Sequence, residues 1–165
     1  MKNSTINKKE IDKFSKIAEE WWDPNGKFKP LHKFNPIRIS YIKENIIKTF
    51  GLDQNKTPLK NIRVLDIGCG GGAFTEQLML SCAPSYLAGV DPSEVQLAFA
   101  QKRPSLKTAE FRKSDAMELP FEENEFDAAT MALVLFFVPE PRRGVAEMLR
   151  VTRPGASISA YAVSY

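Results

Sequence analysis

Two features of this sequence have residue types and a spacing that suit the binding of a charged ligand: a glycine-rich loop and the aspartates around it. The loop spans Gly68–Gly72 and holds four glycines within five residues, so a ligand can approach its backbone without meeting a Cβ atom. Asp66 stands two residues before the loop, and Asp91 stands 23 residues beyond Gly68. An acid at that second distance is placed to accept hydrogen bonds from two ribose hydroxyls. The pattern predicts a nucleotide-type ligand at this loop.

The charge of Asp66 separates two classes of ligand that use such a loop. A carboxylate beside the first glycine repels the pyrophosphate of a nicotinamide dinucleotide, whereas it attracts an ammonium group and, more distantly, a sulfonium. S-adenosylmethionine carries both cations, so the sequence favours it as the cofactor, with Gly68 and Gly70 holding its methionine portion through their backbone. An NAD(P)-dependent oxidoreductase shares the loop and Asp91 but makes poor use of Asp66, and stays the less favoured alternative.

A third aspartate, Asp115, follows a short candidate strand over residues 109–112. At the carboxyl end of that strand it is placed to accept a hydrogen bond from an adenine amino group, although a structural role in a turn stays open. No catalytic base is assigned, because the single histidine, His32, lies among turn prolines. Cys69 and Cys82 are the only cysteines and have neither the spacing of a metal site nor that of a disulfide framework, so no metal is expected.

The elements that must position these residues alternate between strand-like and helix-like segments. Val64, Leu65 and Ile67 belong to an apolar run typical of a strand buried on both faces. Further strands are expected at residues 86–90, 109–112, within 126–138, and at 157–163, with helices at residues 74–79, 93–103 and about 145–152 between them. This order predicts an α/β fold with a doubly wound, Rossmann-like parallel sheet.

The first 60 residues are expected to form a helical extension, and residues 61–165 the S-adenosylmethionine-binding domain. In the extension, an apolar stripe over residues 11–21 predicts one helix, and Asn35-Pro36 has the pattern of a helix start. Ile39, Ile42, Ile46 and Phe50 form the buried stripe of this second helix, which Gly51 ends. Residues 1–60 hold 13 basic and 7 acidic side chains, whereas residues 61–165 hold 10 and 13. The basic surplus is interpreted as a solvated face, and contact with an anionic membrane or an acidic partner stays open.

The fifth strand, at residues 157–163, ends two residues before the end of the sequence. In a doubly wound sheet this strand would be an uncovered edge with apolar side chains. We therefore expect another strand, a second copy of the chain or another partner to cover it, or a missing C-terminal part, so the sequence has the pattern of a fragment.

Composition narrows the remaining classes of function. A net charge of +3 over 165 residues gives no argument for nucleic acid binding. No apolar run approaches the length of a membrane span, and the N-terminus lacks the apolar region of a signal peptide. With only two cysteines, a reducing cytoplasmic location is expected.

Three segments carry a resemblance to a known family. Residues Phe14–Gly26, Leu31–Arg38 and Val64–Gly72 closely resemble the ubiquinone-biosynthesis O-methyltransferase family. This resemblance implies methylation of catechol-type oxygens on polyprenylated quinone precursors with S-adenosylmethionine. It implies a lipophilic quinol or catechol substrate, and leaves open peripheral association with the inner membrane. Arg38, Gly68, Asp91 and Met131 fall on the donor-contacting positions of the family.

From about Ala73 onward the sequence is similar to the broad class I methyltransferases of small molecules. Where the quinone family usually has a Glu-His pair after the fourth strand, this chain has Leu135, Phe136 and Phe137. The change replaces polar groups with apolar ones near the expected acceptor. A degenerate or truncated chain that binds the donor without catalysis is therefore the alternative within this family.

Overall fold

The computed structural model describes residues 9, 12, 13, 16, 20, 25–27, 29–54 and 59–161. Its centre is a five-stranded sheet in the order β3-β2-β1-β4-β5, and all neighbouring strands are parallel. The strands are β1 (Arg63–Ile67), β2 (Tyr86–Asp91), β3 (Glu110–Lys113), β4 (Phe126–Ala132) and β5 (Thr152–Tyr161). The expected α/β class, the parallel sheet and the sequence order of its strands are confirmed.

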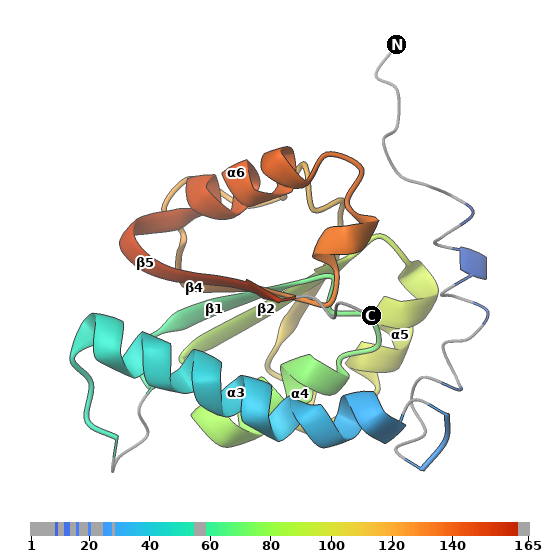
Figure 1. Ribbon diagram of the computed structural model, residues 1–165, viewed down its shortest axis with the longest axis horizontal. Coiled ribbons are helices and arrows are strands. Elements are labelled where there is room, and N and C mark those ends of the chain that lie inside the picture. Colours follow the sequence, from blue (N-terminus) through green and yellow to red (C-terminus); the bar gives the residue numbers. More distant parts are fainter. Residues whose placement is uncertain are drawn as a thin grey trace.

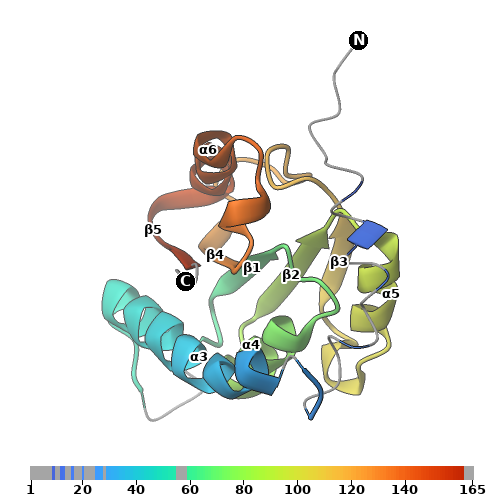
Figure 2. The ribbon, with the colours of Figure 1, turned by 45° about the vertical axis from the view of Figure 1, so that its right-hand side comes forward.

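Helices cover both faces of this sheet. They are α3 (Lys29–Phe50), α4 (Ala73–Cys82), α5 (Glu94–Gln101) and α6 (Pro141–Val151), with two 3-10 turns, η1 (Pro104–Leu106) and η2 (Leu135–Phe137). Helices α3 and α4 lie on one face and α6 on the other (Figure 1). Helix α5 packs on β2 and β3, near the edge of the sheet opposite β5 (Figure 2). None of the described helices is long and apolar enough to cross a membrane.

The period-2 alternation of β1 divides its side chains between two cores. Leu65 and Ile67 belong to the core beneath α6, whereas Val64 belongs to the core shared with α3 and α4. Asp66 has the same parity as Val64, so its side chain lies on the α3 and α4 face at the carboxyl end of the strand. The alternation therefore places the carboxylate of Asp66 next to α3 and α4, away from the core beneath α6.

Helix α3 begins at Lys29, six residues before the expected start, so the interpretation of Asn35-Pro36 as a helix start is wrong. Pro36 lies inside the helix, where it lacks the N–H that would bond to the preceding turn. The buried stripe compensates for this loss, because Ile39, Ile42 and Ile46 are all less than 5% exposed in the core with β1 and α4. The predicted end is confirmed: Gly51 has a φ of +59°, and the amide of Leu52 donates to the carbonyl of Ile47 at 3.0 Å.

The helix expected over residues 11–21 lies mostly outside the described residues. Asp12, Lys13, Lys16 and Glu20 are described within it, and each is helical. The apolar stripe of that helix and the tandem Trp21-Trp22 lie outside the described residues.

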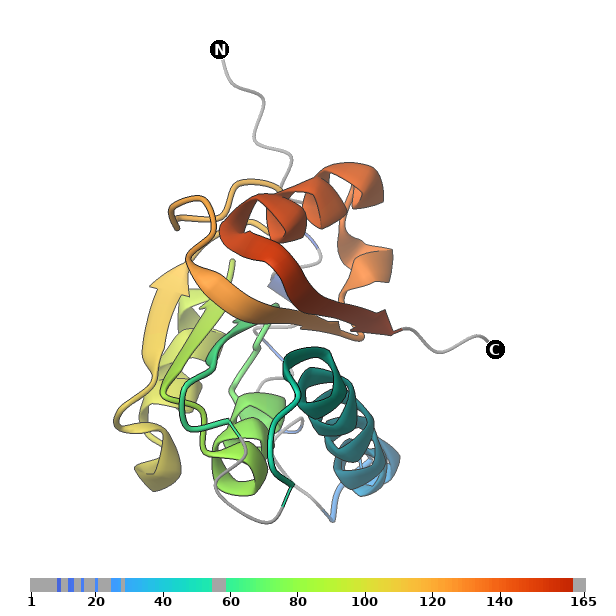
Figure 3. The ribbon, with the colours of Figure 1, turned by 90° about the vertical axis from the view of Figure 1, so that its left-hand side faces the viewer.

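Strand β5 starts at Thr152 rather than at Ser157, so the predicted boundary is wrong. A register shift between Phe126 and Ala128 of β4 accommodates the Pro154-Gly155 segment within β5. Within the described residues β5 pairs only with β4, and it lies at the edge of the sheet facing α3 on one side and α6 on the other (Figure 3). The expected position of the fifth strand at the edge is confirmed for the described strands.

Candidate functional site

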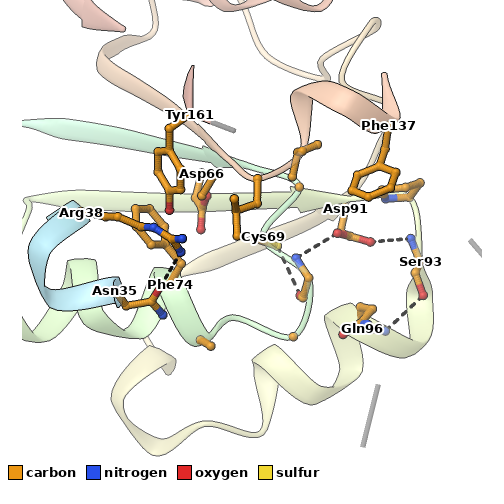
Figure 4. A pocket seen from close by; sticks show the side chains of 18 of the residues that line it. Asn35, Arg38, Asp66, Cys69, Phe74, Asp91, Ser93, Gln96, Phe137 and Tyr161 are labelled. Atoms are coloured by element: carbon orange, nitrogen blue, oxygen red, sulfur yellow. Dashed lines mark hydrogen bonds between the residues drawn. The ribbon is translucent and has the colours of Figure 1, made fainter. Parts of the chain in front are cut away.

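A cavity of about 210 Å³ lies at the carboxyl edge of the sheet. Its walls come from α3, the glycine-rich loop, the start of α4, the turn between β2 and α5, the segment after β4, and the end of β5 (Figure 4). The carboxyl edge is where open parallel sheets bind ligands. The side chains that line the cavity include those of Arg38, Asp66, Asp91 and Tyr161.

The glycine-rich loop folds back over the end of β2. The amides of Gly68 and Cys69 both donate to the carbonyl of Val90, at 2.8 and 3.0 Å. Gly68 has a φ of +71°, and a Cβ atom there would come within 2.3 Å of Val134 Cγ2. Gly70 has a φ of +51°, but a Cβ atom there would meet nothing nearer than 3.9 Å. Gly68 is therefore required for close packing, and Gly70 leaves the backbone of the loop open toward the cavity.

Asp91 connects this loop to the next helix. One of its carboxylate oxygens accepts from the amide of Gly70 and the other from the amide of Ser93, each at 2.9 Å. Burial raises the pKa of Asp91 to about 6, against the lowering effect of these two amides. Ser93 in turn caps α5 by accepting from the amide of Gln96. The backbone around Asp91 is thus fixed, with its carboxylate at the cavity wall.

Asp66 is only 1% exposed and has one carboxylate oxygen satisfied. Thr75 of α4 donates its hydroxyl to Oδ2 at 2.6 Å, whereas Oδ1 has no hydrogen-bond partner among the described residues. Burial raises the pKa of Asp66 to about 7; the Thr75 hydrogen bond opposes this, and the charge of Asp91 adds to it. A buried acceptor without a partner is costly. This oxygen therefore marks a place where a hydrogen-bond donor, best a cation, would be stabilised.

Arg38 brings a positive charge to the same cavity from α3. Its Nη1 donates to Asn35 Oδ1 at 3.4 Å, and its guanidinium carbon lies 4.8 Å from the ring centre of Tyr161 (Figure 4). Asn35 and Arg38 are three residues apart, so they share the helix face that lines the cavity. The site therefore combines a cation from α3 with carboxylates from β1 and β2.

The structure brings five of the seven predicted site residues to this cavity: Arg38, Asp66, Gly68, Gly70 and Asp91. It does not bring Asp115 or Met131 there. Asp115 accepts from the amide of Met117 at 2.9 Å within a turn, and Met131 is fully buried in the core beneath α6. Their roles stay predictions that the geometry of the cavity does not support.

Several lining residues had no functional role in the sequence reasoning. They include Tyr161, Gln96, Phe137 and also His32, which lies within α3 and not in a turn, so its expected place among turn prolines is wrong. Tyr161 and Phe137 had no local signal, because they reach the cavity only through the pairing of β4 with β5 and the turn η2. Phe137 is 49% exposed, so it gives the cavity an apolar rim at the segment after β4. Among the described residues, no group of three His, Cys, Asp or Glu side chains is arranged to hold a metal ion.

Solved structures define the class of protein with this fold. The chain matches an S-adenosylmethionine dependent methyltransferase from Mesorhizobium loti with a TM-score of 0.56 and 26% identity, covering 62% of this chain and 47% of the other. It also matches a SAM-dependent methyltransferase from Methanosarcina mazei with a TM-score of 0.55 and 32% identity, covering 61% and 52%. The cyclase SpnF matches with a TM-score of 0.59 and 31% identity, covering 73% and 43%. The fold is thus the Rossmann-like fold of class I methyltransferases.

The family follows from the sequence itself. A model described as "Methyltransferase domain" matches residues 65–160, and the chain belongs to this family. The ubiquinone biosynthesis O-methyltransferase of Rhizobium etli is 39% identical over 158 residues, which cover 94% of this chain and 63% of that protein. The protein of the same name from Pelagibacter ubique is 61% identical over 98 residues, covering 59% and 40%. The chain therefore spans less than two thirds of the length of these relatives.

Proposed function

We propose that this chain binds S-adenosylmethionine and takes part in O-methylation of a polyprenylated catechol or quinol in ubiquinone biosynthesis. The relative from Rhizobium etli, whose match covers 94% of this chain, is named for that activity. The observation that carries the binding step is Asp66 Oδ1, which has no hydrogen-bond partner in the described part of the chain and is buried in a cavity that also holds Arg38 and Asp91. S-adenosylmethionine presents an ammonium, a carboxylate and two ribose hydroxyls, which match these three side chains in charge and hydrogen bonding.

Each residue of the proposed donor site has a separate task. Asp66 would take the ammonium, Arg38 the carboxylate, and Asp91 the ribose hydroxyls, while the backbone of Gly68 and Gly70 borders the methionine portion. For Asp115 and Met131, a donor contact is proposed only from the position of the first after the carboxyl end of β3 and the family resemblance of the second. Bound S-adenosylmethionine would supply an electrophilic methyl group. The chain's own contribution to rate is alignment of the two reactants and exclusion of water, so we assign no catalytic base.

Calorimetric titration with S-adenosylhomocysteine and, separately, with NAD tests the donor assignment. We expect S-adenosylhomocysteine to bind in the micromolar range and NAD to bind at least 100-fold more weakly, because Asp66 repels a pyrophosphate. Tighter binding of NAD would instead favour the oxidoreductase alternative. A chain that bound neither ligand at millimolar concentration would contradict the proposal.

Asp91→Ala tests the ribose assignment. We expect the dissociation constant of S-adenosylhomocysteine to rise by 10-fold or more, because two hydrogen bonds to a charged group are lost. Asp53→Asn, at an exposed position before β1, is the matched control and should leave affinity unchanged. Unchanged affinity in Asp91→Ala would show that the ribose is bound elsewhere.

Transfer of a labelled methyl group to a short-chain polyprenyl catechol distinguishes an active enzyme from a chain that only binds the donor. The apolar Phe137 at the cavity rim, in a segment where the family has a polar pair, is the observation that favours the non-catalytic alternative. Labelled product above the background of a protein-free reaction would exclude that alternative. Donor binding without any product would support it.

A lipophilic substrate also bears on location and partners. We propose cytoplasmic placement with peripheral association at the inner membrane, supported by the exposed apolar side chains of Phe34, Ile37 and Tyr41 along one face of α3.

We further propose that the open edge of β5 is covered in the assembled protein by a second copy or by another strand. We propose the division into residues 1–60 and 61–165 as a division of the sequence only. Helix α3 shares a core with the sheet, so the two parts are not proposed as separately packed units.

A further inference from the structure

Tyr161 and Asp66 bring two unsatisfied polar atoms to one cavity. The hydroxyl oxygen of Tyr161 is shielded from solvent and, like Asp66 Oδ1, has no partner with hydrogen-bond geometry among the described residues. Figure 4 shows the hydroxyl directed toward Arg38 and Asp66. Each unsatisfied buried group loses the hydrogen bonds that water would give it, which destabilises the folded chain. Two of them in one cavity indicate a ligand that satisfies both.

The two atoms have opposite hydrogen-bonding roles. Asp66 offers an acceptor. Burial raises the pKa of Tyr161 well above its usual value, contact with the positive charge of Arg38 partly offsets this, and the charge of Asp66 adds to it. Tyr161 is therefore a neutral O–H donor at physiological pH, next to the cationic donor Arg38. A cavity with one acceptor and two donors is complementary to the ammonium and carboxylate of an α-amino acid.

Packing on two sides fixes the Tyr161 ring. The ring of Phe74, at the start of α4, packs against it edge to face with 6.1 Å between ring centres. The guanidinium of Arg38 covers it from α3 at 4.8 Å, a cation–π distance. Tyr161 also pairs with Ala132 in the register of β4 and β5. The hydroxyl is thus held in place before a ligand arrives, which reduces the entropy lost on binding.

We propose that Tyr161 binds the α-carboxylate of the amino-acid portion of the ligand by donating its hydroxyl, beside Arg38, while Asp66 receives the ammonium. The inference rests on the proposed binding of S-adenosylmethionine and adds a residue to that site. It also gives the end of β5 a function, because this strand carries the hydroxyl into the cavity. Neither the sequence patterns nor the family resemblance assigned Tyr161 a role.

The test compares two ligands in Tyr161→Phe, which removes the hydroxyl and keeps the ring. S-adenosylhomocysteine has the amino-acid portion, and 5′-methylthioadenosine lacks it. We expect the dissociation constant of S-adenosylhomocysteine to rise about tenfold, because a hydrogen bond to a charged group is lost. That of 5′-methylthioadenosine should stay within about twofold. The melting temperature without ligand should be unchanged or higher, because the variant removes a buried hydroxyl for which the described residues offer no hydrogen-bond partner.

Tyr41→Phe is the matched control, because Tyr41 lies on α3 and is 66% exposed. It should change neither affinity. Equal affinity of Tyr161→Phe and the unmodified chain for S-adenosylhomocysteine would overturn the inference. Equal weakening of both ligands together with a lower melting temperature would overturn it as well, since that result indicates a structural role. If the unmodified chain fails to bind S-adenosylhomocysteine, the proposed function fails first, and the inference with it.

Discussion

Asp66 is the residue at which binding and stability oppose each other. Burial raises its pKa from 3.8 to about 7, the hydrogen bond from Thr75 opposes the shift, and the charge of Asp91 adds to it. The folded chain thus keeps a proton on Asp66 at pH values at which the unfolded chain has released it. The resulting contribution to the free energy of unfolding is complete below about pH 4 and is lost as pH rises to about 7.

We expect Asp66→Asn to be more stable than the unmodified chain without ligand, and more so at pH 8 than at pH 5. The neutral amide has no charge to desolvate, whereas ionisation of the buried carboxyl costs on the order of 4 kcal/mol. Thermal unfolding of both chains at the two pH values measures the difference. The same variant should bind S-adenosylhomocysteine at least tenfold more weakly, because the ammonium loses its counter-charge.

The exposed Asp53→Asn again provides the control, with no expected effect on ligand affinity at either pH. A gain in stability for Asp66→Asn that did not depend on pH would contradict a raised pKa. Unchanged ligand affinity would show that Asp66 does not bind the ammonium of the ligand.

At the scale of an element, α3 joins the core of the sheet to the binding cavity. Ile46 is fully buried between α3 and the sheet, whereas Ile37 on the same helix is 68% exposed. We expect Ile46→Ala to lower the free energy of unfolding by about 2–4 kcal/mol and Ile37→Ala to change it by less than about 0.5 kcal/mol. Urea unfolding of the two variants measures this contrast. Similar losses in both would mean that α3 does not pack on the sheet as described.

The same helix shows why some elements could be predicted and others only in part. The buried stripe and the glycine end of α3 are local signals, and both are confirmed. Its start was placed at Asn35 because an Asn-Pro pair is typical of a first turn and an interior proline is costly. The packing of the isoleucines against the sheet outweighs the cost of the interior proline. A pattern of neighbouring residues does not report this packing energy.

The residues of the site likewise fall into those that local sequence predicts and those that it does not. Asp66, Gly68 and Asp91 were predictable because each lies at the end of an apolar strand, and parallel strands end at one edge of the sheet. Tyr161 was not, since its position depends on a register shift between β4 and β5 and on contacts with α3 and α4. Such contacts join residues far apart in the sequence, so neither periodicity nor motif spacing reports them.

At the scale of the whole molecule, the cavity connects segments from nearly the full length of the described chain. Arg38 comes from before the sheet, the loop from its centre and Tyr161 from its last strand. A ligand that contacts all three should stabilise them together. At 100 times its dissociation constant, S-adenosylhomocysteine should add about 2.7 kcal/mol of stability and raise the melting temperature by about 5–10 °C.

Hydrogen exchange with and without ligand locates this stabilisation. We expect S-adenosylhomocysteine to slow exchange in the glycine-rich loop, in α3 around Arg38 and at the end of β5. With 5′-methylthioadenosine, protection should be confined to the loop and the turn between β2 and α5, because that ligand has no groups for Arg38 or Tyr161. Equal protection by the two ligands would contradict this division of the cavity. It would mean that α3 and β5 respond to the nucleoside alone, and that their charged and hydroxyl groups do not bind the amino-acid portion.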